Sequence, residues 1–482
     1  MTIKAKLKNL VLLHDDVLEN ALKKMNLNEE GVVFVITPQM KLIGLLTDGD
    51  ARRYLLSGGS LKDQVKLVMN DKPVNLHFES SNIEILKVLS KNIRVIPLVD
   101  NEERIVDWAT RFKVRHLPLA EPNLEGNELN YLIDCVRTNW ISSKGKFVTE
   151  FENMLADYVE VKHALAVSNG TAALHLALLS LGIGVGDEVI VPNFTFAASV
   201  NSIIYTGATP VLIDISKDTW TIDQEAVAKA ITPKTKAIMP VHIYGHPCDM
   251  DGIIELARVH ELFIIEDAAQ ALGSKYKGKN AGSFSDAACF SFYGNKIITT
   301  GEGGMILFRD TNVYERALRL RDHGFSPKKR YWHDEVGYNY RLTNLQSAIG
   351  VAQMERIDSF VKRKVKLASL YSEQLQDIEA IHIPKEADWA KSIFWLYTIM
   401  LDVKRAPHSR DDFLKKLEEK GVEARPVFYP IHQMPPYAKY VRKDADFSVS
   451  IKLSEEGISL PSAISLTNDE IYELCKIIRR LL

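Results

Sequence analysis

The sequence predicts an α/β protein in which a small repeated α/β unit precedes a mostly parallel β-sheet with helices on both faces. Three observations carry this prediction. Residues 1–115 repeat themselves at an offset of 63 positions. From residue 117 onwards, apolar strands alternate with apolar helical stretches, which is typical of a parallel sheet covered by helices. Residues able to carry chemistry fall at the ends of several of these strands, where ligands of such folds gather.

The composition is that of an ordinary globular protein with more than one hydrophobic core. The chain has 482 residues, of which 46% are hydrophobic and 25% are charged, and its formal net charge is -2. That charge excludes a global basic field for nucleic acid or for an anionic membrane. The four cysteines form no Cys-x-x-Cys pair, which argues against a disulfide framework and a zinc site and favours reduced thiols.

The N-terminus does not have the pattern of a signal peptide, because Asp15 and Asp16 interrupt its apolar patch and no small-residue cleavage site follows. No apolar run reaches the roughly 18 residues that span a bilayer. We therefore expect a cytoplasmic protein, with any connection to a membrane running through a product or a partner.

The repeat is visible in matched segments of residues 1–115. The matched pairs are residues 11–14 with 74–77, residues 35–36 with 98–99, residues 41–43 with 104–106, and Thr47 with Thr110. Each copy predicts a short strand, a helix and two further strands joined by a polar turn. Because so short a unit cannot bury its apolar faces alone, we expect the two copies to pack together.

The first copy contains a motif that resembles a nucleotide contact. The segment GLLTDGD, residues 44–50, looks like the contact motif of a CBS domain, and two such domains form a CBS pair, or Bateman module. The resemblance implies that Thr47 and Asp50 hold ribose and phosphate of an adenine nucleotide, with a guanine nucleotide left open, and that helix amides take the phosphate. The second copy carries Asp107 and Lys113 at the equivalents of Gly44 and Asp50, so at most one good site is expected. A repeat used only for packing or dimerisation is the alternative.

A boundary is predicted near residues 115–122, where prolines and a glycine interrupt the pattern. Strands and helices then alternate. The predicted strands are Val189–Val191, Pro210–Ile215, Ala237–Val241, Phe263–Glu266 and Ala287–Phe292, and the helices include Ala172–Leu181 and Met250–Val259.

The segment Ser168-Asn169-Gly170-Thr171 immediately precedes an apolar helix that is predicted to start at Ala172. Glycine lets the backbone approach an anion, threonine offers a hydroxyl, and the helix N-terminus supplies amides and the positive end of its dipole. The segment is therefore a candidate phosphate cradle. An ordinary Ser or Asn helix cap is the alternative.

Asp267 ends an apolar predicted strand. A carboxylate there can pair with a pyridinium nitrogen and keep it protonated, which makes the ring an electron sink. The alternative is an aspartate that caps a helix over Ala268–Leu272.

Lys296 lies in SFYGNKIITTGEGG, after a strand and before a glycine-rich turn. Lysine forms an imine with an aldehyde cofactor, although a single loop lysine is usually a solvated charge. The order of the motifs favours the cofactor lysine: Gly-Thr at a helix start, Asp at a strand end, Ser-x-x-x-Asn-Lys, and then Gly-Glu-Gly-Gly.

This ensemble closely resembles the DegT/DnrJ/EryC1/StrS sugar aminotransferases, a fold-type I pyridoxal-phosphate family. The resemblance runs from about Leu117 to the C-terminus. Its motifs are WISSKGKFVTEFE, SNGTAALHLAL, GDEVIVPNFTF, PVHIYGHPCDM, IIEDAAQALG, FSFYGNKIITTGEGG and GYNYRLTNLQSAIG. It implies a large pyridoxal-phosphate-binding domain over residues 116–370 and a small C-terminal α+β domain over residues 371–482.

The resemblance also implies roles for single residues. Lys296 is the Schiff-base lysine of pyridoxal 5'-phosphate and shuttles the proton, Asp267 pairs with the pyridine nitrogen, and Gln270 reaches the ring hydroxyl. The remaining cofactor contacts would be Phe196 on the ring face, Gly170, Thr171 and Ser291 at the phosphate, Asn295 beside the lysine, and Asn339 with Arg341 at the phosphate of a neighbouring subunit. Such a shared site implies a homodimer or a higher homo-oligomer.

Two segments, KRYWHD from Lys329 and EARPVFYPIH from Glu423, resemble the perosamine synthases of this family, which aminate C4 of a GDP-linked 4-keto-6-deoxymannose. The resemblance implies a nucleotide-linked 4-keto-6-deoxy sugar as acceptor and L-glutamate as donor, in the synthesis of a surface polysaccharide such as an O-antigen. Aromatic faces suit its rings and cations suit its diphosphate. The candidate substrate contacts are Trp140, Ser142, Tyr331, His333 and Arg425.

Alternatives stay open for the substrate and for the class of protein. The aromatic residues could instead pack a dimer interface. Gln270 stands where perosamine synthases often carry Glu, which keeps a UDP- or dTDP-linked keto sugar, aminated at C4 or C3, open. A dehydratase of the related family would carry His in place of Lys296. A non-enzymatic regulator that only senses a nucleotide is a further alternative, but it would not need Asp267 and Lys296, so the presence of both residues argues against it.

Overall fold

The computed structural model describes residues 7–28, 30–90, 93–114 and 117–482. The chain divides into two compact units, Met1–Leu117 and Pro118–Leu482. The boundary predicted at residues 115 and 116 falls outside the described residues. Within the described ranges, no helix combines the length and the apolar character needed to cross a membrane.

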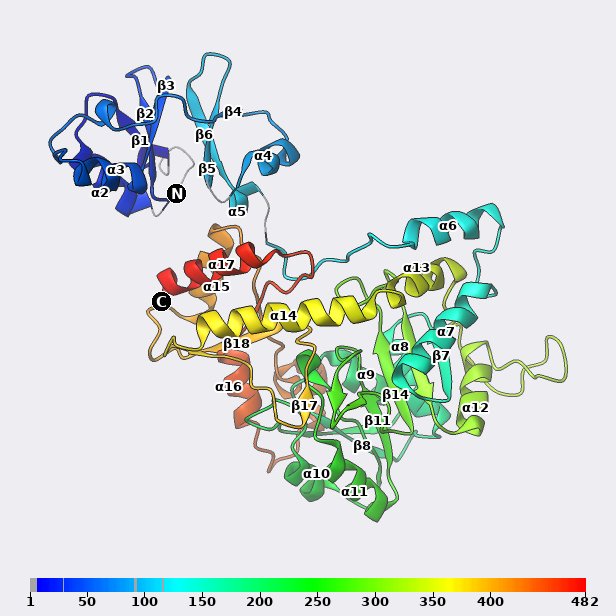
Figure 1. Ribbon diagram of the computed structural model, residues 1–482. Helices are drawn as coiled ribbons and strands as arrows, with labels where there is room; N and C mark the ends of the chain where they lie inside the picture. The colour runs from blue at the N-terminus through cyan, green and yellow to red at the C-terminus, as the bar shows by residue number, and fades with distance from the viewer. Residues whose placement is uncertain (1–6, 29, 91–92, 115–116) are drawn as a thin grey trace. The chain divides into compact units, whose positions relative to one another are not determined.

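The N-terminal unit is built from two copies of one three-stranded arrangement (Figure 1). In each copy the first strand pairs parallel with the second, and the second pairs antiparallel with the third. The elements are β1 (Val11–Leu13), α2 (Leu18–Asn28), β2 (Val32–Ile36), β3 (Leu42–Thr47), α3 (Asp48–Leu56), η1 (Val65–Leu67), β4 (Leu76–His77), α4 (Asn82–Val88), β5 (Val95–Val99), β6 (Ile105–Thr110) and α5 (Arg111–Val114).

The internal repeat is confirmed in the second and third strands of each copy, while the first strands, β1 and β4, pair with a register that differs by one residue. Strands β2 and β5, and strands β3 and β6, begin and end 63 positions apart. The equivalent turn residues Met40 and Glu103 both have positive φ angles, 67° and 60°. The turns also pair reciprocally, because Leu42 N donates to Glu103 O at 3.0 Å and Ile105 N donates to Met40 O at 2.9 Å. One apolar core contains residues of both copies, so the two copies pack together as expected.

The C-terminal unit is organised around a seven-stranded sheet in the order β7-β15-β14-β11-β10-β8-β9. All neighbours are parallel except β15, which runs antiparallel to both β14 and β7. The strands are β7 (His163–Val167), β8 (Glu188–Pro192), β9 (Thr209–Ile213), β10 (Thr235–Ile238), β11 (Phe263–Asp267), β14 (Ala287–Ser291) and β15 (Gly304–Phe308).

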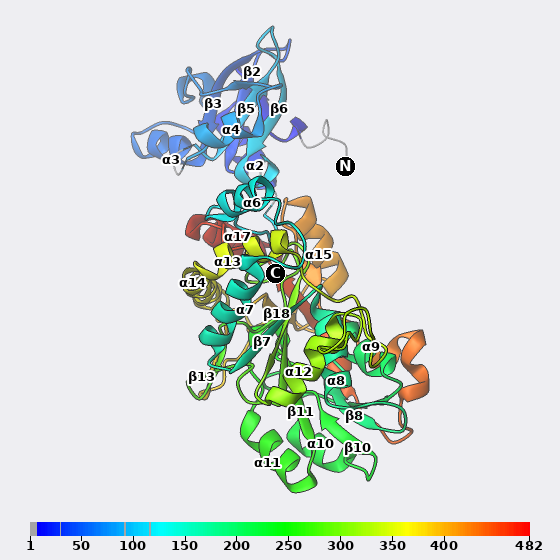
Figure 2. The same cartoon turned by 90° about the vertical axis from the view of Figure 1, so that its right-hand side faces the viewer.

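Helices cover both faces of this sheet, as predicted. Alternate residues of β14 enter different cores: Ala288 and Phe290 belong to the core under α7 and α13, and Ala287 and Cys289 to the core under α8 and α9. Helices α10 and α11 pack side by side over strands β9, β10 and β11 (Figure 1, Figure 2). The helices are α6 (Glu128–Arg137), α7 (Lys146–Val159), α8 (Gly170–Ser180), α9 (Ala197–Tyr205), α10 (Gln224–Ala230), α11 (Met250–His260), α12 (Thr311–Arg321) and α13 (Asn344–Met354).

The C-terminal third adds a long helix, a four-stranded antiparallel sheet in the order β16-β18-β20-β19, and three further helices. Helix α14 crosses the predicted boundary between residues 370 and 371, and β17 joins β12 and β13 in a small separate sheet. The elements are β12 (Lys275–Tyr276), β13 (Lys279–Asn280), α14 (Ile357–Leu375), β16 (Ile381–His382), β17 (Ala390–Lys391), β18 (Tyr397–Leu401), α15 (Arg410–Glu419), β19 (Arg425–Pro426), α16 (Ser448–Glu456), β20 (Gly457–Leu460) and α17 (Asn468–Leu481).

The five predicted strands and the two predicted helices of this unit are all present, with bounds shifted by a few residues. The alternative considered for Asp267, a helix over residues 268–272, is not found, because these residues form turns. The carboxyl ends of β7, β8, β11 and β14 meet at one edge of the sheet because these four strands run in the same direction. Each of them is followed by residues that the sequence marks as functional.

Candidate active site

The candidate phosphate cradle lies where β7 ends and α8 begins. Asn169 caps the helix, because its Oδ1 accepts the N–H of Ala172 at 2.8 Å. The cap alternative is thus realised by Asn169, while Gly170 and Thr171 occupy the first turn, whose amides have no intrahelical acceptor. Ser291, the last residue of β14, faces this turn. A Cβ on Gly170 would stand 2.9 Å from Ser291 Cβ and 3.2 Å from its Oγ, so only glycine fits without movement.

Asp267 ends β11 as a buried carboxylate. Its Oδ2 accepts the hydroxyl proton of Ser199 at 2.7 Å, and its Oδ1 accepts the N–H of Ala269 at 3.2 Å. The alternative of a helix capped by Asp267 is not realised, since the carboxylate and the amide of Ala269 close a turn instead. Ser199, on the first turn of α9, was not identified from the sequence.

Gln270 is buried three residues after Asp267. Its Oε1 accepts the N–H of Tyr244 at 2.7 Å, so its Nε2 is the end that can donate to a ring oxygen. Tyr244 has a positive φ of 50°. The Gln270 contact therefore fixes a strained backbone segment as well as a candidate cofactor contact.

Lys296 lies in the loop after β14, and its amine faces an aromatic ring. Its Nζ is 4.1 Å from the centroid of the Trp395 ring. Burial lowers the pKa of Lys296 to about 8, while the nearby Asp267 carboxylate opposes this shift. Lysine at this pKa is partly neutral near neutral pH, which is the state that attacks an aldehyde. The structure therefore brings Lys296 and Asp267 into one electrostatic site.

Asn295, beside the lysine, has two different contacts. Its carbonyl accepts the indole N–H of Trp395 at 2.8 Å. Its side-chain Oδ1 is buried and has no hydrogen-bond partner in the described part of the chain. An orphaned acceptor at this place suits a site that a polar ligand completes.

Phe196 precedes α9 and is 58% exposed. It lies at one end of an aromatic row. The ring of Phe428 is 5.7 Å from Phe196 and 5.5 Å from Tyr244, with a 17° angle to the latter, and Tyr244 is 6.3 Å from Trp395 with a 12° angle. The row joins the predicted stacking residue to the wall beside Lys296. Tyr244 and Trp395 were not identified from the sequence, because a single aromatic residue usually belongs to the core.

Asn339 and Arg341 lie on a segment beside β7. Arg341 donates from Nε and Nη2 to Asn339 Oδ1 at 3.1 and 3.0 Å, and its Nη1 lies 2.9 Å from Asp322 Oδ1. Between them, the carbonyl of Tyr340 accepts the N–H of Ser168 at 2.8 Å. The structure brings the two predicted residues together; their reach into a neighbouring subunit stays a prediction.

The five candidate substrate residues are less tightly grouped. Trp140, Tyr331 and Arg425 are exposed, Tyr331 at 74%. The Nη2 atom of Arg425 lies 2.5 Å from Glu423 Oε1. His333 donates from Nδ1 to the carbonyl of His323 at 2.8 Å. The carbonyls of Trp140 and Ser142 are held by the side chain and backbone N–H of Asn344, at 2.7 and 2.8 Å. Among the described residues, no hydrogen bond, ion pair or ring contact joins any two of these five.

A buried pair behind Asp267 was also missed. His242 donates from Nε2 to Glu266 at 2.8 Å, and its Nδ1 accepts the N–H of Cys248. The Glu266 carboxylate also accepts from Gly282 N and from Ser285 Oγ. Burial raises the pKa of Glu266, but these hydrogen bonds outweigh it and lower the pKa below its ordinary value. The pair ties β11 to the segment that carries Tyr244.

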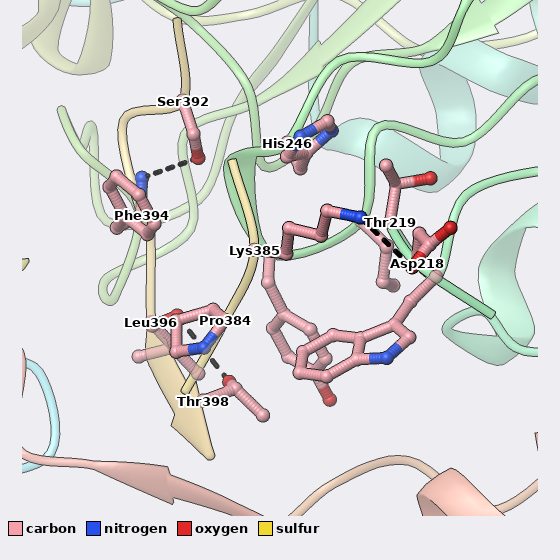
Figure 3. Close-up of a pocket in the computed structure, with 12 residues that line it drawn as sticks. Asp218, Thr219, His246, Pro384, Lys385, Ser392, Phe394, Leu396 and Thr398 are labelled. Carbon is pink, nitrogen blue, oxygen red and sulfur yellow. Dashed lines mark hydrogen bonds and ion pairs between the residues drawn. The ribbon is translucent and has the colours of Figure 1, made fainter. Parts of the chain in front are cut away.

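A separate pocket is lined in part by Tyr244 and is drawn in Figure 3. Lys385 and Asp218 form an ion pair at 3.1 Å beside it, and Ser392 Oγ accepts the N–H of Phe394 at 3.0 Å. Its described lining residues include none of those predicted from the sequence.

In the N-terminal unit, Thr47 and Asp50 contact each other. Thr47 caps α3, with its Oγ1 accepting Asp50 N at 3.1 Å and donating to Asp50 Oδ2 at 2.6 Å. Arg53 holds the other carboxylate oxygen of Asp50 at 2.5 Å. This arrangement is a helix capping box.

The C-terminal unit is similar to proteins of known family. The sequence model of the "DegT/DnrJ/EryC1/StrS aminotransferase family" matches residues 122–479. Similar proteins include a GDP-perosamine synthase of Escherichia coli O157:H7, 46% identical over 75% of this chain and 98% of that protein. One from Caulobacter vibrioides is 48% identical over 74% of this chain and 95% of that protein.

Two solved structures show the same fold. The S. venezuelae enzyme DesV, in complex with a ketimine intermediate, is 35% identical with a TM-score of 0.69 and covers 73% of this chain and 94% of its own. An aminotransferase from Psychrobacter cryohalolentis is 30% identical with a TM-score of 0.71 and covers 75% of this chain and 98% of its own.

Proposed function

The chain belongs to the DegT/DnrJ/EryC1/StrS family and is a pyridoxal-phosphate-dependent sugar transaminase, and on that premise we propose that it aminates C4 of a GDP-linked 4-keto-6-deoxy sugar with L-glutamate as donor. The carrying observation is the 46–48% identity to several GDP-perosamine synthases over nearly their whole length. Bound pyridoxal phosphate supplies an aldehyde and an electron-accepting ring.

The residues present fit that cofactor. Because residue 170 is glycine, Ser291 lies close to the first turn of α8, where its hydroxyl and the free amides of that turn suit a phosphate. The buried Asp267 carboxylate suits a pyridinium nitrogen, and the orphaned Oδ1 of Asn295 suits a polar ligand. Lys296 carries the amine, and its lowered pKa suits proton exchange near neutral pH.

The chain's own residues divide the work as follows. Ser199 holds Asp267 in place, and Asp267 would pair with the ring nitrogen of a bound cofactor and favour its protonated form. Gln270 can donate its Nε2 N–H to the ring hydroxyl. The Nζ of Lys296 would accept a proton from the amine-bearing carbon of the donor in one half of the reaction, and would give a proton to the sugar carbon that receives the amine in the other.

The substrate experiment is a panel. Purified protein, L-glutamate and GDP-, UDP- and dTDP-linked 4-keto-6-deoxy sugars are incubated, and the amino sugars are identified by mass spectrometry. We expect the GDP-linked ketone to give the largest kcat/KM. A Lys296→Ala variant serves as the control and should produce no amino sugar. Equal turnover by that variant would refute the role of Lys296.

A UDP- or dTDP-linked keto sugar, aminated at C4 or C3, is the second candidate, because Gln270 departs from the Glu common in perosamine synthases. A preference of the wild-type protein for either of these nucleotides in the panel would replace the GDP proposal. The position of the new amine follows from NMR of the product.

We also propose that residues 1–115 form a CBS pair that binds a nucleotide at Thr47 and Asp50, in support of which stand the repeat and the GLLTDGD motif. Calorimetric titration with adenine and guanine nucleotides tests this. Thr47→Ala should abolish binding heat. Thr110→Ala, at the equivalent capping position of the second copy, is the matched control and should leave it intact. Absence of heat with the wild-type protein would remove the proposal.

Homodimerisation, with Asn339 and Arg341 reaching a partner's cofactor, is a further part of this proposal. Arg341→Ala should weaken cofactor binding in a protein whose sedimentation coefficient still corresponds to a dimer. An unchanged cofactor affinity would assign Arg341 to its own chain's ion pair with Asp322.

A further inference from the structure

We propose that Trp395 is a positioning residue for Lys296, whose protonated amine it holds against the face of its indole ring beside the cofactor site. The Nζ of Lys296 lies 4.1 Å from the centroid of that ring. A cation over an aromatic face at this distance is attracted by the ring quadrupole, most strongly for tryptophan. The inference relies on the proposed function only in naming Lys296 as the catalytic lysine.

The Trp395 ring is fixed and is not a mobile neighbour. It is 4% exposed. Its indole N–H donates to the carbonyl of Asn295 at 2.8 Å, so it is bonded to the residue that precedes the lysine. The Tyr244 ring lies nearly parallel to it, 6.3 Å away at 12°. The ring therefore keeps its face toward Lys296 through a hydrogen bond and through packing.

Lys364, on α14, fixes the backbone of Trp395. Its Nζ donates to the carbonyls of Trp395 and Ser462, both at 2.6 Å. Burial lowers the pKa of Lys364 to about 7. A neutral amine still has two N–H donors and two carbonyls to receive them, so this contact survives loss of the proton. Lys364 therefore holds the backbone of Trp395 both when its own amine is protonated and when it is neutral.

The groups facing Lys296 come from several elements. Asp267, at the end of β11, favours its protonated form. A cavity beside Lys296 is lined by Lys364 from α14 and by Glu121, which accepts a hydrogen bond from Ser465. In addition to these groups, the ring of Trp395 lies directly against the amine of Lys296. A lysine that accepts and donates a proton is protonated during part of the reaction. The indole face stabilises that protonated amine in a fixed position.

The test is the pKa of Lys296 in the full-length, cofactor-free protein. Competitive acetylation across pH, read by mass spectrometry of the Lys296 peptide, gives this pKa without any turnover. Trp395→Phe and Trp395→Leu form a series with a weaker ring and no ring. We expect the pKa to fall in the order Trp, Phe, Leu, by about half a unit to one and a half units in all.

The opposite order identifies a different cause. If the substitutions only let water reach the amine, the pKa rises from Trp to Leu, and that result or an unchanged pKa overturns the proposal. Trp389→Phe and Trp389→Leu are the matched controls, since Trp389 packs on Tyr276 and His246; they should leave the pKa of Lys296 in place.

Fluorinated tryptophan provides a variant that keeps the shape. Fluorine withdraws charge from the ring face, so its incorporation should lower the pKa of Lys296 in the wild-type background and not in Trp395→Phe. An equal shift in both backgrounds contradicts the proposal. The proposed function is tested separately by borohydride trapping of the cofactor on Lys296, so a failure there leaves the labelling result interpretable.

Discussion

Gly170→Ala tests whether the closeness of α8 to β14 shapes a cofactor phosphate site. The added Cβ would stand 2.9 Å from Ser291 Cβ and 3.2 Å from Ser291 Oγ, so the serine or the helix start must move. Overpacking of this kind costs about 1–3 kcal/mol, and the lower entropy of the unfolded alanine chain offsets about 0.4–1 kcal/mol of it. We therefore expect a net loss of stability of about 0–2.5 kcal/mol.

The effect on cofactor affinity should be larger than the effect on folding. Displacing the first-turn amides and the Ser291 hydroxyl removes hydrogen bonds to a charged group, each worth about 1.5–3 kcal/mol. Loss of one such bond weakens binding by about 10- to 150-fold. Titration of pyridoxal phosphate, followed by absorbance, measures the dissociation constant, and urea unfolding measures stability.

Two variants make this prediction refutable. Gly294→Ala, in the following loop, has nothing within 4 Å of its new Cβ and should bind the cofactor like the wild type. Adding Ser291→Gly to Gly170→Ala removes the contacted atoms and should restore stability while affinity stays low. Wild-type affinity of Gly170→Ala would refute the reasoning.

Three further predictions follow from the buried groups. Ser199→Ala removes the hydrogen bond to Asp267 and should lower kcat by roughly tenfold, which corresponds to about 1.4 kcal/mol. Ser202→Ala, at a buried serine on the same helix, is the control and should leave kcat unchanged. Steady-state kinetics measures kcat, and circular dichroism checks that both variants are folded. Glu266→Gln should lower the free energy of unfolding by about 3 kcal/mol at pH 7, because an amide replaces a carboxylate that accepts several N–H and O–H groups. The pKa of Glu266 in the folded protein lies below its ordinary value of 4.5, so the stability that its carboxylate contributes is present above that pH and is lost as the pH falls through the lowered pKa. The free energies of unfolding of wild type and Glu266→Gln, measured with urea, should therefore become equal in acid. A difference that stays constant with pH would contradict this. The rate of cofactor attachment to Lys296 should rise about tenfold per pH unit below about 8 and level off above it, because only the neutral amine reacts. A stopped-flow rate that still rises about tenfold between pH 8 and 9 would exclude a lowered pKa, and a flat profile from pH 6 to 9 would exclude a pKa near 8.

Sequence reasoning was most successful where the signal is local. The offset of 63 positions predicted paired copies, and strands β2 and β5 reproduce it at both ends. Apolar runs predicted the strands because a parallel sheet is buried on both faces. Gly170, Asp267 and Lys296 could be found because each stands next to a strand or helix end.

The alternative of a helix over residues 268–272, which the local sequence allows, shows the limit of that approach. Alanine and leucine favour helix, but the Asp267 carboxylate binds Ala269 N and the Gln270 side chain binds Tyr244 N, and these bonds hold the segment in turns. Tertiary hydrogen bonds therefore outweighed a weak local propensity. Thr47 and Asp50 likewise bind each other, because they form the hydrogen bonds of the cap at the start of α3.

Local sequence context alone marks Lys296, Asp267 and Gly170 as candidates for the chemistry. The residues that surround them depend on tertiary packing. Trp395 bonds to a residue 100 positions away, and Ser199 to one 68 positions away. Contacts over such separations leave no period or local motif in the chain, because they arise when independently formed strands and helices pack. The lysine could therefore be proposed from its sequence context, whereas no local pattern marks the ring that lies against its amine.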